Sequence, residues 1–121
     1  MICELVKLEE VYRTKDGAVL QCNNKNCFWL EFAGNHTAFR VQDFLQFKKT
    51  VDQIDLEDML IDSSRASDYT LLMPFRTQRC FLLDVTQLLA LKEILQGAMF
   101  MLELNSLLKA CLTDKPMVSH N

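Results

Sequence analysis

Two cysteines with four residues between them form the pattern with the most chemical content in this chain. Cys22 and Cys27 flank a polar segment at 23–26, and Cys3 lies near the start of a predicted strand that could pair alongside. Thiolates across a turn can bind zinc, which prefers four ligands in a tetrahedron, and His36 at a neighbouring turn is a candidate for the fourth. Because the chain has no second closely spaced cysteine pair, reduced strand-end cysteines are the favoured interpretation. We therefore assign no metal or cofactor and keep zinc bound by Cys3, Cys22 and Cys27 as the alternative.

His36 is the residue best suited to acid–base chemistry. It follows Gly34-Asn35 in a predicted turn, where Asp16 or Glu31 could orient its imidazole. Trp29 shares a predicted strand face with Glu31 and could line a shallow groove. The chain has no phosphate-binding glycine loop, nucleophile elbow or dinucleotide fingerprint. We therefore predict no catalytic residues, and an enzyme with a pocket near Trp29 and His36 is the least favoured function.

The charge balance argues against nucleic acid as a partner. Thirteen Lys and Arg residues stand against sixteen Asp and Glu, which leaves a formal net charge of −3. The longest basic run is the pair Lys48-Lys49, whereas a nucleic-acid binder needs a concentrated basic surface. Half of the residues are hydrophobic, so we expect a buried core and not a disordered chain.

Neither a secretory signal nor a membrane span is predicted. The first residues contain no basic segment followed by an apolar one. The most apolar segment, 94–102, is too short to cross a bilayer, which takes about 20 residues. We therefore expect a cytoplasmic protein with no membrane partner, in which the five cysteines stay reduced. Cys80 and Cys111 lie within apolar patterns and are interpreted as core cysteines.

The first half of the chain is predicted to form four strands and then a helix. Apolar runs separated by turn residues predict strands at 5–13, 18–22, 27–32 and 37–41. Asp16-Gly17 predicts a tight turn with positive φ between the first two strands. Alternation along the third strand places Phe28, Leu30 and Phe32 on the core face and Cys27, Trp29 and Glu31 on the other. A helix at 42–54 is predicted by apolar residues at three- and four-residue spacing, namely Phe44, Phe47, Val51 and Ile54.

The second half is predicted to form a hairpin and a long helix. The hairpin pairs 69–75 with 79–84, and the helix covers 85–112. Asp84 suits the N-cap position, and Gln87 three residues later completes a capping box.

These elements predict an α+β fold with about six mainly antiparallel strands and two helices, in the order ββββ-α-ββ-α. Residues 1–112 form one domain, and 113–121 form a flexible tail because they contain a proline and lack periodicity. The acidic stretch 52–62 is interpreted as a solvated helix end and connector, since it lacks the glycine-bearing loop of a cation site.

The long helix carries apolar residues on two different faces. One face can cover the sheet and consists of Leu88, Leu91, Ile94, Leu95, Ala98, Met99 and Leu102. The second lies nearly opposite, mainly in the second half of the helix: Leu89, Phe100, Met101, Leu104, Leu107, Leu108 and Cys111. We predict that the last six of these residues form a homodimer interface, because large apolar faces are rarely left in water. The alternative is a helix wedged between the sheet and the first helix, with no partner. The predicted function is a non-enzymatic binding or assembly module, with the small zinc protein as the alternative.

Part of the pattern resembles a known family. The residues concerned are Cys3, Asp16-Gly17-x-Val19-x-x-Cys22, Cys27-x-x-Leu30-x-Phe32 and Asp43-Phe44-x-x-Phe47. They are similar to a family of small uncharacterised Bacteroidota proteins that share a domain of unknown function, over 3–108 of this chain. Many members of that family have a tighter Cys-x2-Cys where this chain has Cys22 and Cys27. The resemblance implies no activity, cofactor or partner.

Overall fold

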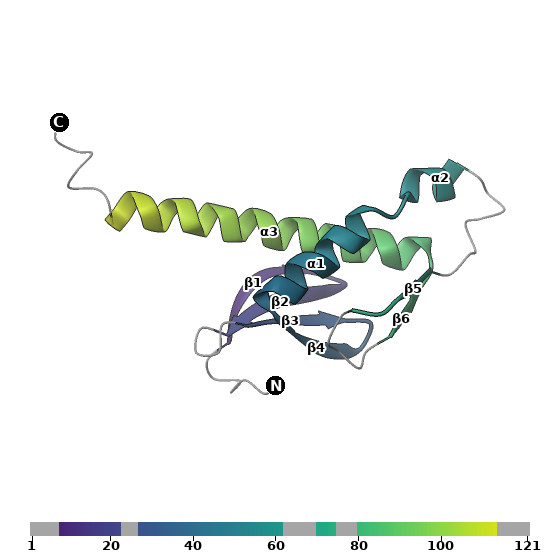
Figure 1. Cartoon of the computed structure of the whole chain (residues 1–121), viewed down its shortest axis with the longest axis horizontal. Coiled ribbons are helices and arrows are strands. Elements are labelled where there is room, and N and C mark those ends of the chain that lie inside the picture. The colour runs from purple at the N-terminus through teal and green to yellow at the C-terminus, as the bar shows by residue number, and fades with distance from the viewer. Residues whose placement is uncertain (1–7, 23–26, 62–69, 75–79, 114–121) are drawn as a thin grey trace.

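The computed structural model has an α+β fold and describes residues 8–22, 27–61, 70–74 and 80–113 (Figure 1). Its strands and main helices follow the predicted order ββββ-α-ββ-α, both sheets are antiparallel, and a short helix is added after the first. The elements are β1 (Leu8–Thr14), β2 (Gly17–Cys22), β3 (Cys27–Phe32), β4 (Asn35–Arg40), α1 (Val41–Asp52), α2 (Leu56–Ile61), β5 (Thr70–Leu72), β6 (Phe81–Leu83) and α3 (Val85–Thr113). The predicted tail is described only at Thr113, which ends α3; its other residues lie outside the described ranges.

The first four strands form a meander in which each strand pairs with the next. Lys15-Asp16 is the loop between β1 and β2, and we expected a positive φ at this turn. That expectation was wrong, because positive φ occurs among the described residues only at Ala33 and Gly34, in the β3–β4 turn. Gly17 instead begins β2, where a Cβ would collide with the backbone carbonyl of Glu31. Gly17 is therefore required for close packing between strands, not for turn conformation.

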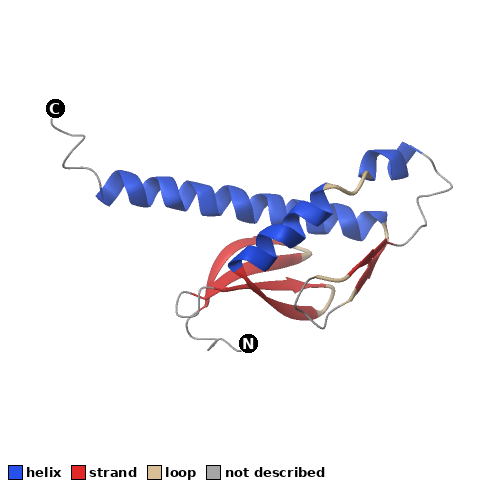
Figure 2. Ribbon diagram, in the orientation of Figure 1, coloured by secondary structure: helices blue, strands red, loops and turns tan. Residues whose placement is uncertain are grey.

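One face of the four-stranded sheet is covered by helices, with α3 along β1 and β2 and α1 over β3 and β4 (Figure 2). Phe28, Leu30 and Phe32 belong to the buried core, as the alternation along β3 predicted. The ring centroids of Phe28 and Phe44 lie 4.7 Å apart, and those of Phe32 and Phe81 lie 6.4 Å apart. Burying one such side chain contributes about 1.5–3 kcal/mol, so this aromatic layer binds α1 and β6 to the sheet.

The acidic stretch 52–62 contributes to the core through α2. We interpreted it as a solvated connector, which is wrong for Leu56 and Met59 because both are buried. These two residues are three positions apart and so lie on the same side of a short helix. Asp55 and Glu57 are exposed, as expected.

The second sheet is shorter than predicted, with three residues in each strand. Phe81 and Leu83 face the core, while Leu82 faces solvent opposite Leu71. We expected Cys80 to be a core cysteine, and that was wrong because it is exposed. Successive residues of a strand point to opposite faces, which places Cys80 on the solvent side with Leu82.

The start of α3 is stabilised by the predicted capping box. The backbone N–H of Gln87 donates to Asp84 Oδ1 at 2.9 Å, and the backbone N–H of Asp84 donates to Gln87 Oε1 at 3.0 Å. These two bonds satisfy N–H groups that have no partner within the helix, which defines where α3 begins.

Gly97 marks the point where α3 approaches β1 most tightly. A Cβ at this position would collide with the ring of Tyr12, so the ring lies where a side chain would be. Glycine inside a helix is about 1 kcal/mol less favourable than alanine. Packing against Tyr12 therefore outweighs helix propensity here.

We predict that Gly97→Ala destabilises the protein by about 1–3 kcal/mol, although alanine favours the helix. Ser106→Ala, an exposed position of the same helix, is the matched control and should stay within about 0.5 kcal/mol of the unmodified chain. Urea unfolding followed by circular dichroism measures both changes. A stabilised Gly97→Ala variant would show that Tyr12 can move away without loss of packing.

Candidate functional site: the projecting arm of α3

The second half of α3 extends beyond the sheet and is called the arm, residues 100–113 (Figure 1). The first half is buried through Leu88, Leu91, Ile94, Leu95 and Ala98, each of them fully covered. Beyond Ala98 none of the described α3 side chains is fully buried. The predicted first stripe is therefore confirmed up to Ala98, and its last members, Met99 and Leu102, pack against the core while partly exposed.

The arm carries an exposed apolar face. Phe100 is 62% exposed, Leu107 64% and Leu112 73%. The face, called the arm face below, consists of Phe100, Met101, Leu104, Leu107, Leu108, Cys111 and Leu112. Sequence reasoning missed Leu112, although it lies four residues after Leu108 and so on the same side of the helix. Cys111 had been assigned both to the core and to this second face; the core assignment was wrong, because the helix has left the domain at that point and the thiol is exposed.

The other side of the arm is polar. At 100° per residue the arm face covers an arc of about 140°. The exposed residues Glu103, Ser106 and Lys109 lie outside that arc. Within it, Phe100, Leu104, Leu107 and Cys111 alternate at four- and three-residue steps, which is the spacing of a helix–helix seam. The arm is thus an amphipathic helix whose apolar side is largely exposed.

The alternative of a helix wedged between the sheet and α1 applies only to the first half of α3. Leu88 and Leu95 are buried in the core that includes α1 and the sheet. On the arm face, by contrast, Phe100 and Leu108 are each more than half exposed. The chain's own fold therefore leaves this face open.

By length and apolar composition, Val85–Leu112 is long enough to cross a membrane. A third of the most apolar window, 33%, is nevertheless buried inside the domain. Core helices of globular domains can meet the same criteria, and the buried residues of α3 belong to such a core.

Cys22 and Cys27 are both buried and lie directly opposite each other in the β2–β3 ladder. His36, the suggested fourth zinc ligand, is the register partner of Glu31. Glu31 lies four residues after Cys27 in β3, so His36 is about 13 Å from Cys27 along the strand direction. Cys3 lies outside the described residues. Among the residues that are described, no group of three or more His, Cys, Asp and Glu could hold a metal ion. The zinc hypothesis therefore depends on Cys3 and stays a prediction.

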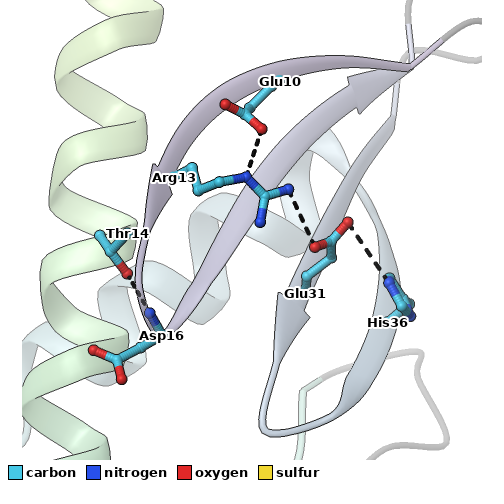
Figure 3. Close-up of polar contacts among 6 residues, drawn as sticks. All are labelled: Glu10, Arg13, Thr14, Asp16, Glu31 and His36. Carbon is cyan, nitrogen blue, oxygen red and sulfur yellow. Dashed lines mark hydrogen bonds and ion pairs between the residues drawn. The ribbon is translucent and has the colours of Figure 1, made fainter.

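His36 takes part in a row of ion pairs on the sheet face opposite the helices (Figure 3). Its Nε2 lies 3.6 Å from Glu31 Oε2, and Arg13 Nη2 donates to Glu31 Oε1 at 3.3 Å. Arg13 Nε also donates to Glu10 at 2.6 Å, and this bond is the main reason why the pKa of Arg13 is raised. The structure thus brings Glu31 to His36, as suggested. Asp16 lies apart from His36 at the β1–β2 turn, where its backbone N–H donates to Thr14 Oγ1 (Figure 3). His36 is 62% exposed, so water weakens these interactions.

A cavity of about 260 Å³ lies between the β1–β2 and β3–β4 turns and is lined in part by Asp16, Ala33 and His36. Trp29 is not among its lining residues; it lies two residues before Glu31 in β3, further from the β3–β4 turn. The suggested groove near Trp29 and His36 is therefore not formed by this cavity. The walls of the cavity carry both basic and acidic side chains, so the cavity has no clear preference for one class of ligand.

Deleting most of the arm should leave the domain folded, because the described core does not extend beyond Leu102. We predict that a chain ending at Leu102 unfolds cooperatively, with a free energy of unfolding within about 1 kcal/mol of that of the full chain in dilute solution. Urea unfolding at low protein concentration tests this. A truncated chain that loses its cooperative transition would show that the arm is needed for folding.

No family model, no curated protein and no solved structure matches the chain, so its function is argued from its own geometry.

Proposed function

We propose that this protein is a non-enzymatic assembly module that forms a homodimer by pairing the arm faces of two chains. The observation that carries the proposal is the exposure of a contiguous apolar face on a helix that has already left its own core. Soluble proteins seldom leave several hundred Å² of apolar surface in water unless it binds something. The proposal places the protein in the cytoplasm.

A second copy of the chain is an occupant of the right size. A specific interface buries about 1,000 Å² or more in total, so each arm face would contribute about half of that. Full burial of a large apolar side chain contributes about 1.5–3 kcal/mol, against an association cost of about 4–15 kcal/mol. Each chain offers five such side chains, Phe100, Leu104, Leu107, Leu108 and Leu112. Together they can support a stable dimer.

A lipid bilayer fits the arm less well. The arm is about 20 Å long at 1.5 Å per residue, whereas the hydrocarbon core of a bilayer is about 30 Å thick. Spanning would require the first half of α3 to leave the core, which would expose Leu88, Leu91 and Ile94. Helices that lie on a bilayer surface are rich in Lys and Arg on their polar side, while this arm has Lys109 and the acidic Glu103.

An antiparallel overlap of the two arms suits the position of β1. Tyr12 of β1 covers α3 at Gly97, so a partner helix cannot extend along the same side far beyond Phe100. In an antiparallel pair centred between Leu104 and Leu107, the C-terminal end of one arm lies beside Phe100 of the partner subunit and does not extend further along α3. The two domains then lie at opposite ends, and a two-fold axis relates identical surfaces.

We predict that Leu104→Glu converts the dimer to a monomer, because pairing would bury two carboxylates without counter-charges. Ser106→Glu introduces the same charge two residues away on the polar side and should remain dimeric. Sedimentation equilibrium at tens of micromolar measures both. A monomeric unmodified chain at that concentration, or equal loss of association in the two variants, would contradict the proposal.

The orientation of the arms can be tested separately through Cys111. In the antiparallel pair this thiol faces Phe100 of the partner subunit, and the two copies of Cys111 lie about 17 Å apart along the helix axis. Mild oxidation should therefore give no dimer linked through Cys111, as judged by non-reducing electrophoresis of a variant that keeps only this cysteine. Efficient cross-linking would instead support a parallel pair, in which the two thiols meet.

A further inference from the structure

The two cysteines of the β2–β3 hairpin are placed as a disulfide requires. Cys22 is the last residue of β2 and Cys27 the first of β3, and they are register partners. Directly opposed residues in an antiparallel pair have Cα atoms about 4.5–5.5 Å apart, and disulfides occur at Cα separations of about 4.4–6.8 Å. The backbone therefore needs no large movement for the two sulfur atoms to bond.

The two thiols lie in an apolar environment. Directly opposed residues project to the same side of a sheet, so both sulfur atoms lie on the face opposite the helices. Both side chains are fully buried and pack with Leu8 and Trp29 in a small apolar cluster. Among the described residues, no third metal-ligating side chain forms a group with the two cysteines. Two facing thiols have one characteristic reaction, the formation of a disulfide.

We propose that Cys22 and Cys27 are a dithiol that closes reversibly to an intrachain disulfide by exchange with a low-molecular-weight disulfide such as oxidised glutathione. In the first step, one protein thiol gives up its proton to solvent, and its thiolate attacks glutathione disulfide. A mixed disulfide forms and one glutathione thiolate leaves. The second protein thiol then loses its proton, attacks the protein sulfur of the mixed disulfide and releases the second glutathione. The protein loses two electrons and two protons, and one glutathione disulfide becomes two thiols.

The position of the pair makes this exchange possible despite burial. Cys22 and Cys27 form the last pair of the β2–β3 ladder, and their pairings with Leu8 and Arg40 are also end pairs of their ladders, so a local opening at this end breaks only terminal pairs. Such an opening exposes one thiol for the first step. When the hairpin re-forms, the second thiol lies next to the mixed disulfide. The closing step is then intramolecular and strongly favoured over attack by a second glutathione molecule from solution.

The test uses the full chain with Cys3→Ser, Cys80→Ser and Cys111→Ser, so that only the pair remains. The protein is equilibrated without oxygen in mixtures of reduced and oxidised glutathione, quenched with acid and alkylated. Intact mass spectrometry then counts thiols. We expect a form lower in mass by two hydrogen atoms and without alkylation, exceeding the mixed disulfide by at least about tenfold. Adding Cys22→Ser is the matched control and should leave only a free thiol or a mixed disulfide.

The unmodified chain gives an independent readout if the serine variants fold poorly. Trypsin cleaves after Lys25, which separates the two cysteines into the peptides 16–25 and 26–40. These peptides should be recovered as one linked species after oxidation and as two species after reduction. Recovery of the pair only as mixed disulfides, or linkage only in protein that has lost its native circular dichroism spectrum, would overturn the proposal.

Discussion

The length of α3 relative to the sheet that it covers is the constraint on which the rest of the molecule depends. Strands of six or seven residues span about 20 Å, whereas the 29 residues of α3 span about 43 Å. One face of the helix is buried from Val85 to Ala98, again about 20 Å, which is comparable to the length of the strands. Beyond that point, each apolar side chain needs another partner or must remain in water.

The apolar residues of α3 change sides where this support ends. Up to Ala98 most of them face the core, and from Phe100 onwards the large ones except Leu102 lie on the other side of the helix. Gly97 lies at the transition, where the ring of Tyr12 replaces a side chain and brings β1 against the helix. The same contact that anchors α3 thus limits where another helix can bind, which is why the proposed pairing is confined to the arm.

The four-stranded sheet has two faces of different character. Its covered face holds the aromatic core around Phe28 and Phe44, whose packing positions α1. Its other face carries the buried pair Cys22 and Cys27 at one end and the polar contact between Glu31 and His36 at the other. Because register separates these two groups along β3, they act as separate sites: an apolar dithiol and a solvated network.

Sequence patterns determined the element order, the inward face of β3, the capping box at Asp84 and the two apolar faces of α3. These features depend on spacing along one element, which local periodicity records. Only the tertiary structure decided that Gly17 serves close packing and that Cys111 is exposed. It also decided that Leu56 and Met59 join the core and that His36 lies far from the cysteine pair along the sheet. Such facts depend on strand register and on which surfaces meet, and residues distant in the chain set both.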